Sequence, residues 1–395
     1  MDNLVCREML WPDEIEQMLS IRNAIFPPIC REDWLRFPAN TASMAFLHGI
    51  AIGAIPLDQR PFQVAPGKVI DTAFEHAVGT RADFRSRGVG GAMIEAALEF
   101  LCDRAEALMV YRGGERSPGY RFYERSGHTD LIYMRPMTWR PKNVRADGVA
   151  VGGLEECLAL QPELLRVFNA AFGDYGGFRP RGIGYWEMAL SDMIFTVIPQ
   201  EVLFARYPAE GELQAYCIAT IRTGARASEQ ISIMELAATS EDAVREVLRA
   251  TGAEAAARGW SVAAICSVDS PWRVAMRELG FEEGLRHTMI MGQPIAPARL
   301  FAKVCADQGA ITELKINVWS PGYEDTIWEG PEAKREVTIE GKELLLNRML
   351  MRRLDVATAV AGDLLTIAGE RADDRERLAA ALPYVPWEHH WIDWT

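Results

Sequence analysis

The stretch DFRSRGVGGAM (residues 83–93) places Arg85 and Arg87 directly before a glycine-rich turn. The preceding segment, VIDTAFEHAVGT (69–80), alternates as a strand does, and AMIEAALEFL (92–101) has the spacing of an amphipathic helix. Unpaired amides at the start of a helix, with arginines nearby, attract anions. The stretch is therefore predicted to bind a phosphate group. The alternative is an ordinary glycine turn with solvent-exposed arginines.

The spacing of the glycines separates this loop from two other phosphate-binding motifs. Residues 85–90 read R-x-x-G-x-G, and Met93 stands where G-x-G-x-x-G would require its third glycine. The P-loop pattern G-x-x-x-x-G-K-[ST] is absent from the sequence. A dinucleotide-binding loop and a P-loop are thus disfavoured, and a pyrophosphate held by R-x-x-G-x-G is preferred.

Composition limits the classes of partner. A formal net charge of −13 argues against nucleic acid as the main partner, although a small anion can still bind a local basic loop. The seven cysteines are scattered without a C-x-x-C pair, a pattern typical of reduced thiols and not of a metal site. No apolar run is long enough for a membrane span. We expect a cytoplasmic protein without a bound metal or a membrane partner.

The chain is predicted to contain three segments, 1–139, 140–292 and 293–395. The first two share a helix–glycine–strand unit, YRFYERSGHTDLIYM (120–134) and WRVAMRELGFEEGLRHTMIM (272–291). In the second copy, Glu241 and Asp242 stand where the first has its basic loop. The second segment is therefore interpreted as a structural copy without an anion site.

The segments HAVGTRADFRSRGVGGAM (76–93) and YRFYERSGH (120–128) resemble the acetyl-coenzyme A signature of the GNAT N-acetyltransferases. The three-segment layout is similar to the Eis-like branch of that superfamily. This resemblance implies an α/β (α+β) fold with two tandem mixed-sheet GNAT-type domains and a sterol-carrier-like C-terminal domain. It also implies acetyl transfer from acetyl-CoA to a primary amine of a small, aminoglycoside-like acceptor, and a homo-oligomer, hexameric in the Eis-like branch.

The resemblance also assigns residues to the donor. One group would contact the pantetheine arm through its backbone, and the other would hold the pyrophosphate. The first group is Val78, Gly79 and Thr80, and the second is Arg85, Ser86, Arg87, Gly88, Val89 and Gly90.

Four residues are candidates for proton transfer. Tyr123 matches the tyrosine that many superfamily members use as general acid, whereas the Eis-like branch has an aromatic hydroxyl at the position of His128. Either residue could donate the proton. The resemblance implies that the carboxylate of Thr395, at the end of an aromatic tail, acts as base, and Glu75 is a second candidate. Three of them have a structural alternative: core packing for Tyr123, a surface position for His128, and a solvent-facing strand position for Glu75.

Three functions remain open at this stage, and the preferred one is acetyl transfer from acetyl-CoA to a small amine. Direct attack of the amine on the thioester is favoured over an acyl-enzyme, because Cys102, expected in the core of the helix, has no basic partner nearby. The alternatives are an acyltransferase with another acyl donor or a peptide acceptor, and an acyl-CoA- or lipid-binding regulator without turnover.

Overall fold

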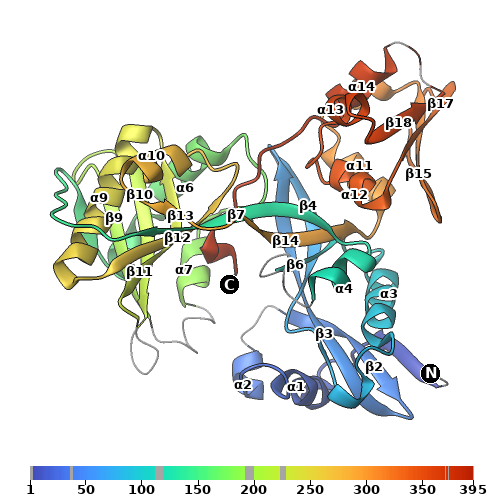
Figure 1. Cartoon of the computed structure of the whole chain (residues 1–395), viewed down its shortest axis with the longest axis horizontal. Helices are drawn as coiled ribbons and strands as arrows, with labels where there is room; N and C mark the ends of the chain where they lie inside the picture. Colours follow the sequence, from blue (N-terminus) through green and yellow to red (C-terminus); the bar gives the residue numbers. More distant parts are fainter. Residues whose placement is uncertain are drawn as a thin grey trace. The chain divides into compact units, whose positions relative to one another are not determined.

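The computed structural model describes residues 3–35, 39–111, 119–191, 200–222, 228–369, 371 and 373–394. Contacts divide the chain into two compact units (Figure 1). Unit 1 comprises Met1–Leu131 and Thr288–Val385, and unit 2 comprises Ile132–His287 and Pro386–Thr395. The division into three domains at 139 and 292 stays a prediction. Within the described part of the chain, no helix combines the length and apolarity that a membrane span requires.

Unit 1 contains a mixed sheet with strand order β1-β2-β3-β4-β6-β14, in which β4 and β6 are parallel. Side chains alternate across it: Met44 faces the cluster of Ile15 and Met18, whereas Ala45 faces the cluster of Met93 and Ile94. Helices α1 and α3 thus cover opposite faces. The elements are β1 (Leu4–Glu8), α1 (Ile15–Asn23), α2 (Arg31–Trp34), β2 (Ala39–Leu47), β3 (Ile50–Ala65), β4 (Lys68–Glu75), β5 (Gly79–Thr80), α3 (Val89–Leu101), β6 (Ala107–Tyr111), α4 (Tyr120–Arg125) and β14 (His287–Pro294).

The C-terminal part of unit 1 forms a second, four-stranded sheet of order β16-β15-β17-β18. Its helix α11 also packs on β4, and Arg299 and Lys303 of α11 pair with the buried Glu106. The elements are α11 (Pro297–Val304), β15 (Leu314–Ser320), β16 (Tyr323–Glu329), β17 (Arg335–Gly341), α12 (Glu343–Leu350), α13 (Val356–Ala361), β18 (Leu365–Ala368) and α14 (Asp374–Ala381).

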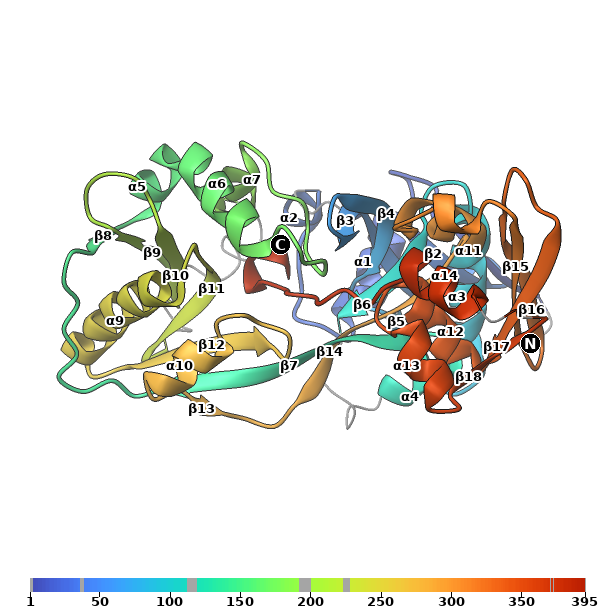
Figure 2. The ribbon, with the colours of Figure 1, turned by 90° about the horizontal axis from the view of Figure 1, so that it is seen from above.

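Unit 2 repeats the mixed sheet with order β7-β12-β11-β10-β9-β8, and β11 and β12 are its parallel pair. Helix α9 packs along β9, β10 and β11, and α6 and α7 lie on the other side of these strands (Figure 2). The elements are β7 (Thr129–Trp139), β8 (Ala150–Gly152), α5 (Leu154–Ala159), α6 (Gln161–Phe172), α7 (Tyr185–Ser191), β9 (Gln200–Tyr207), β10 (Ala215–Arg222), β11 (Gln230–Ala238), α9 (Glu241–Arg258), β12 (Ser261–Ser267), α10 (Arg273–Glu278), β13 (Glu282–Glu283) and η4 (Trp391–Trp394).

The two repeats exchange their last strands. β7 follows the helix–glycine unit of the first repeat, yet its residues 134–139 pair with β12 of unit 2. β14 follows the corresponding unit of the second repeat, yet its residues 290–294 pair with β6 of unit 1. Each sheet is thus completed by a strand from the other half of the sequence.

Candidate functional site

A cavity of about 850 Å³ opens in unit 1 beside the glycine-rich loop. It lies where β5, residues 84–88, the first turn of α3 and one side of α4 come together. The lining is apolar at Ile25 and Phe122 and basic at its arginines. Its residues are Ile25, Val78, Gly79, Thr80, Phe84, Arg85, Ser86, Gly88, Val89, Gly90, Gly91, Arg121, Phe122, Arg125 and Ser126.

The loop turns sharply before α3 and leaves the start of that helix uncapped. Ser86 and Gly88 have positive φ angles of 58° and 82°, and the latter residue, as N-cap, offers no side chain to the first amides. The first turn of α3 contains no acidic residue. Its free amides and the positive end of the helix dipole therefore favour an anion at this wall of the cavity.

Two glycines of the cavity wall are required by close packing. A β-carbon at Gly90 would come within 2.8 Å of the Phe122 ring, so this glycine allows α4 to approach α3. A β-carbon at Gly79 would lie 2.7 Å from Ile25. These glycines shape the cavity through the protein's own packing, in addition to the exposure of backbone that the sequence suggests.

The arginines of the cavity come from two elements. Arg85 donates from Nε to the carbonyl oxygen of Thr80 at 3.1 Å, which ties the loop to β5. Arg121 and Arg125 line the cavity from α4, and the sequence analysis did not select them. Their i,i+4 spacing in YRFYERS was the available signal, because it places both on one face of a helix. Positive charge thus faces the cavity from both α4 and the loop.

Of the nine residues predicted for the donor, eight line this cavity: Val78, Gly79, Thr80, Arg85, Ser86, Gly88, Val89 and Gly90. Arg87 is not among the lining residues. Its guanidinium carbon lies 5.8 Å from the centre of the Phe84 ring, and its side chain is solvent-exposed. That these residues bind a donor remains a prediction, and their convergence on one cavity is what the structure adds.

Glu75 and His128 meet in the interior of unit 1. The imidazole Nε2 lies 3.0 Å from the Glu75 Oε1 atom, and neither side chain is exposed. The solvent-facing alternative for Glu75 and the surface alternative for His128 are therefore wrong. Tyr123 packs edge-on against the imidazole with 5.2 Å between ring centres. Three of the four predicted proton-transfer residues thus form one buried cluster.

The imidazole of His128 is contacted at its other nitrogen by Gln293 of β14. The Gln293 amide nitrogen lies 3.2 Å from the imidazole Nδ1, whereas Glu75 lies next to Nε2. Asn347 of α12 donates to the Gly127 carbonyl at 2.9 Å. These contacts fix the turn that positions the imidazole.

The fourth candidate, Thr395, lies outside the described residues. The tail before it is largely buried in unit 2. Trp387 is fully buried, as the aromatic composition suggests, and its carbonyl accepts a hydrogen bond from Ser267 Oγ at 2.6 Å. Asp393 forms an ion pair with Arg181. Cys102, expected in the core, is instead exposed directly after the last residue of α3, Leu101.

The buried carboxyl of Glu388, in this tail, gives a testable dependence of stability on pH. Burial raises the pKa of Glu388 well above its ordinary value, and Asp269 acts in the same direction. Such a carboxyl stabilises the fold while protonated, and the contribution is lost as pH rises through the raised pKa. Glu388→Gln is therefore expected to raise the Tm at pH 8 by roughly 2–4 °C, the effect of about 1 kcal/mol in a unit of this size, and to change little at pH 5.

The measurement is thermal unfolding at both pH values. Asp242→Asn, in which a 98% exposed side chain loses its charge, is the control and should show no pH-dependent difference. An equal effect of Glu388→Gln at pH 5 and pH 8 would contradict the assignment of a neutral Glu388.

Unit 2 differs from unit 1 at the start of its long helix. Ser240 caps α9 by accepting a hydrogen bond from the Ala243 amide at 3.2 Å, and Glu241 and Asp242 lie in the first turn. The helix dipole is thus already compensated by carboxylates. This arrangement disfavours an anion at α9, in contrast to the open start of α3.

Comparison of the sequence with protein families gives a match over the part of unit 1 that contains the cavity. Residues 5–128 match the acetyltransferase (GNAT) family. The matched GNAT segment contains the loop, the cavity wall from α4, and the cluster of Glu75, Tyr123 and His128. Members of this family use an acyl-CoA as co-substrate. A search of curated proteins gives no significant match.

Solved structures extend the likeness to nearly the whole chain. A GCN5-related N-acetyltransferase from Anabaena variabilis is 11% identical with a TM-score of 0.72, and the match covers 99% of each chain. One from Kribbella flavida is 16% identical (TM-score 0.66, 98% of this chain and 99% of that one). Eis1 from Mycobacterium abscessus is 13% identical (TM-score 0.64, 97% and 98%). The predicted mixed α/β class, with a large mixed sheet and a second, four-stranded sheet, is thereby confirmed, and it is consistent with tandem GNAT-type domains.

Proposed function

We propose that this protein transfers an acetyl group from acetyl-CoA to a primary amine of a small acceptor. The observation that carries the proposal is the cavity of about 850 Å³ bounded by the uncapped start of α3 and by Arg85, Arg121 and Arg125. A pyrophosphate is the donor group that matches free helix amides and guanidinium groups together. The GNAT match of residues 5–128 supports acyl transfer from an acyl-CoA in general.

The chemistry requires two proton transfers. The amine nitrogen attacks the thioester carbonyl, a C–N bond forms, the C–S bond breaks, and the thiolate leaves with a proton from a general acid. Tyr123 and His128 are the candidates for the acid. Glu75 and the Thr395 carboxylate are the candidates for the base that takes the amine proton. We favour direct attack over an acyl-enzyme, because no cysteine is among the residues that line the cavity.

The acceptor, the assembly and the C-terminal part of unit 1 belong to the same proposal. Aminoglycoside-like amines are the first acceptors to test, and a homo-oligomer, hexameric by resemblance, is the expected assembly. We propose that the sterol-carrier-like segment, 293–395, has a packing role in preference to lipid binding. Gln293 and Asn347 of this segment contact the turn at Gly127 and His128. A cytoplasmic location fits the free thiols at Cys6, Cys102, Cys157, Cys217, Cys266 and Cys305.

Donor binding is tested by thermal unfolding with and without acetyl-CoA. The wild-type protein is expected to gain a higher Tm, and Arg85→Ala/Arg87→Ala to lose most of that gain, because Arg85 lines the cavity and each charge-assisted hydrogen bond lost weakens binding by roughly tenfold or more. Arg277→Ala, which removes a 61% exposed arginine of unit 2, should keep the full gain.

Thiol release with a panel of aminoglycosides, polyamines and lysine peptides then separates an enzyme from a binding protein. A Tm that does not respond to acetyl-CoA or any longer acyl-CoA would refute the proposal. A response without thiol release from any acceptor would favour a regulatory protein.

A further inference from the structure

The parallel strands of unit 2 separate partway along their length. β11 and β12 pair only from Gln230–Ser232 to Ser261–Ala263. Beyond this register β11 continues to Ala238 and β12 to Ser267, and over these lengths no β11–β12 pairing is found among the described residues. The separation leaves an opening bounded by residues 233–236 of β11, residues 264–266 of β12, and Met276 of α10.

The C-terminal segment of the chain fills this opening. Glu388, His389, His390 and Trp391 complete its lining, and a volume of only about 30 Å³, room for roughly one water, remains. Backbone bonds join the segment to the loop after α6: the Gly176 amide donates to the Pro386 carbonyl at 3.0 Å, and the Glu388 amide donates to the Gly176 carbonyl at 2.9 Å. These two bonds form a single parallel β-bridge between Gly176 and Trp387.

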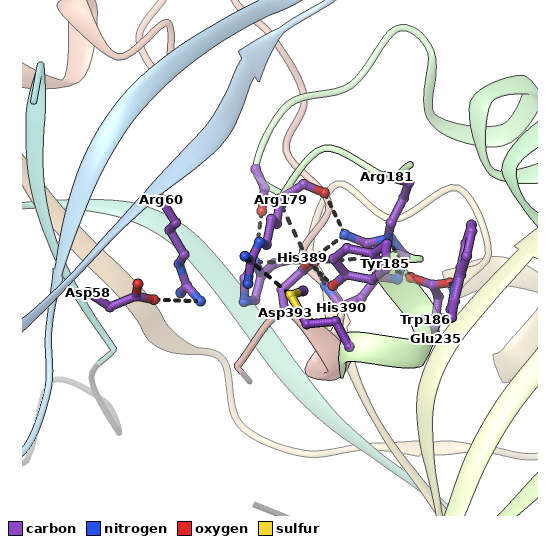
Figure 3. Close-up of polar contacts among 12 residues, drawn as sticks. Asp58, Arg60, Arg179, Arg181, Tyr185, Trp186, Glu235, His389, His390 and Asp393 are labelled. Atoms are coloured by element: carbon purple, nitrogen blue, oxygen red, sulfur yellow. Dashed lines mark hydrogen bonds and ion pairs between the residues drawn. The ribbon is translucent and has the colours of Figure 1, made fainter. Parts of the chain in front are cut away.

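Arg181 clamps the end of the segment through a buried ionic network. Its guanidinium pairs with Asp393 of the segment and with Glu235 of β11, at 2.5 Å in each case, and all three side chains are at most 2% exposed (Figure 3). Tyr185 donates to the Asp393 carboxylate at 2.8 Å. Burial alone would raise the pKa of Asp393, but Arg181 lowers it well below its ordinary value, so the carboxylate is ionised.

The order of elements around the filled opening is also found in unit 1. Both units follow the succession strand, long helix, parallel strand, short helix: β4-α3-β6-α4 in unit 1 and β11-α9-β12-α10 in unit 2. The short helix lines the space in each case, through Phe122 of α4 and through Met276 of α10. Among the described residues, the unit 1 cavity has no lining residue on β4 or β6, whereas the unit 2 opening lies between β11 and β12 and is filled by the C-terminal segment.

We propose that unit 2 is a peptide-binding domain whose ligand is the C-terminal segment PWEHHWIDWT of this same chain. Recognition rests on three features: backbone pairing with Gly176, burial of the Trp387 indole, and the Asp393 carboxylate held by Arg181. A separate peptide of this sequence should therefore bind the emptied opening. The proposal concerns unit 2 alone and does not depend on acyl transfer by unit 1.

The test cuts the folded protein without removing any part of it. A protease recognition site is inserted after Tyr384, which is exposed, and the folded full-length chain is then cleaved. We expect the segment to stay bound during gel filtration under native conditions. It should exchange slowly against an excess of fluorescent synthetic PWEHHWIDWT, which fluorescence anisotropy follows. The uncut protein should take up no peptide, because its own segment fills the opening.

Substitutions in the synthetic peptide keep the protein itself unchanged. An Asp393→Asn peptide is expected to bind on the order of 100-fold more weakly, since it leaves Arg181 without one of its buried partners. A Glu388→Gln peptide, the matched control, should bind within a fewfold of the wild-type peptide. Loss of the cleaved segment without any rebinding of the synthetic peptide would overturn the proposal, as would equal binding of the Asp393→Asn and wild-type peptides.

Discussion

Replacing Arg181 with methionine is expected to lower the free energy of unfolding by about 3–5 kcal/mol, because it leaves two buried carboxylates without their cation. The guanidinium is fully buried and pairs with both Glu235 and Asp393. Burial alone would lower the pKa of Arg181, but these two carboxylates raise it well above its ordinary value, so the arginine is charged at neutral pH. Urea unfolding measures the loss. Arg277→Met, on the surface of unit 2, should cost less than about 0.5 kcal/mol.

The same variant should acquire a characteristic pH dependence. In the wild-type protein, the lowered pKa of Asp393 contributes stability above the ordinary aspartate value, and this contribution is lost only as pH falls through the lowered pKa. Without Arg181, burial raises the pKa of the same carboxyl, and its protonation on acidification then relieves the unpaired charge. The deficit of Arg181→Met should therefore be smaller at pH 5 than at pH 8. A deficit that is constant with pH would contradict the ionic network.

Glu75→Gln and His128→Asn are each expected to lower kcat by roughly 10²–10⁴-fold if the buried pair transfers a proton during acyl transfer. The two side chains lie 3.0 Å apart and would act as one unit, so the double variant should be little worse than either single variant. Steady-state thiol release with the best acceptor measures kcat. A preserved Tm gain with acetyl-CoA shows that each variant still folds and binds the donor.

Tyr123→Phe is the matched variant for the competing acid. It keeps the ring that packs against the imidazole and removes only the hydroxyl. A large loss in Tyr123→Phe together with near-normal activity in His128→Asn would assign the acid to the tyrosine. Unchanged activity in both variants would remove both candidates.

Features encoded within a short stretch of sequence could be predicted. Residues 85–90 combine a left-handed glycine, basic side chains and a helix start, and each of these depends only on its immediate neighbours. The cap of Ser240 on α9 likewise involves only residues close together in the sequence. Eight of the nine donor residues consequently fall in one cavity, although the binding itself remains to be measured.

Features that depend on tertiary structure could not be predicted. Glu75 and His128 are far apart in the sequence, and the alternation of β4 does not show which partner the last side chain of the strand meets. The aromatic tail predicts its own burial, but nothing near residue 393 indicates that Arg181 will pair with it. The last strand of each repeat has the same pattern whichever sheet it joins, so the strand exchange is invisible in the sequence.

The exchange of β7 and β14 constrains how this chain can be divided. A fragment that ends at Trp139 would lack β14, which covers the edge of β6, and would carry β7 without β12 to pair with. Exposed strand edges of this kind promote aggregation. Although the first two segments are repeats, we expect neither to fold stably when expressed alone, so a fusion or a hybrid protein must contain both.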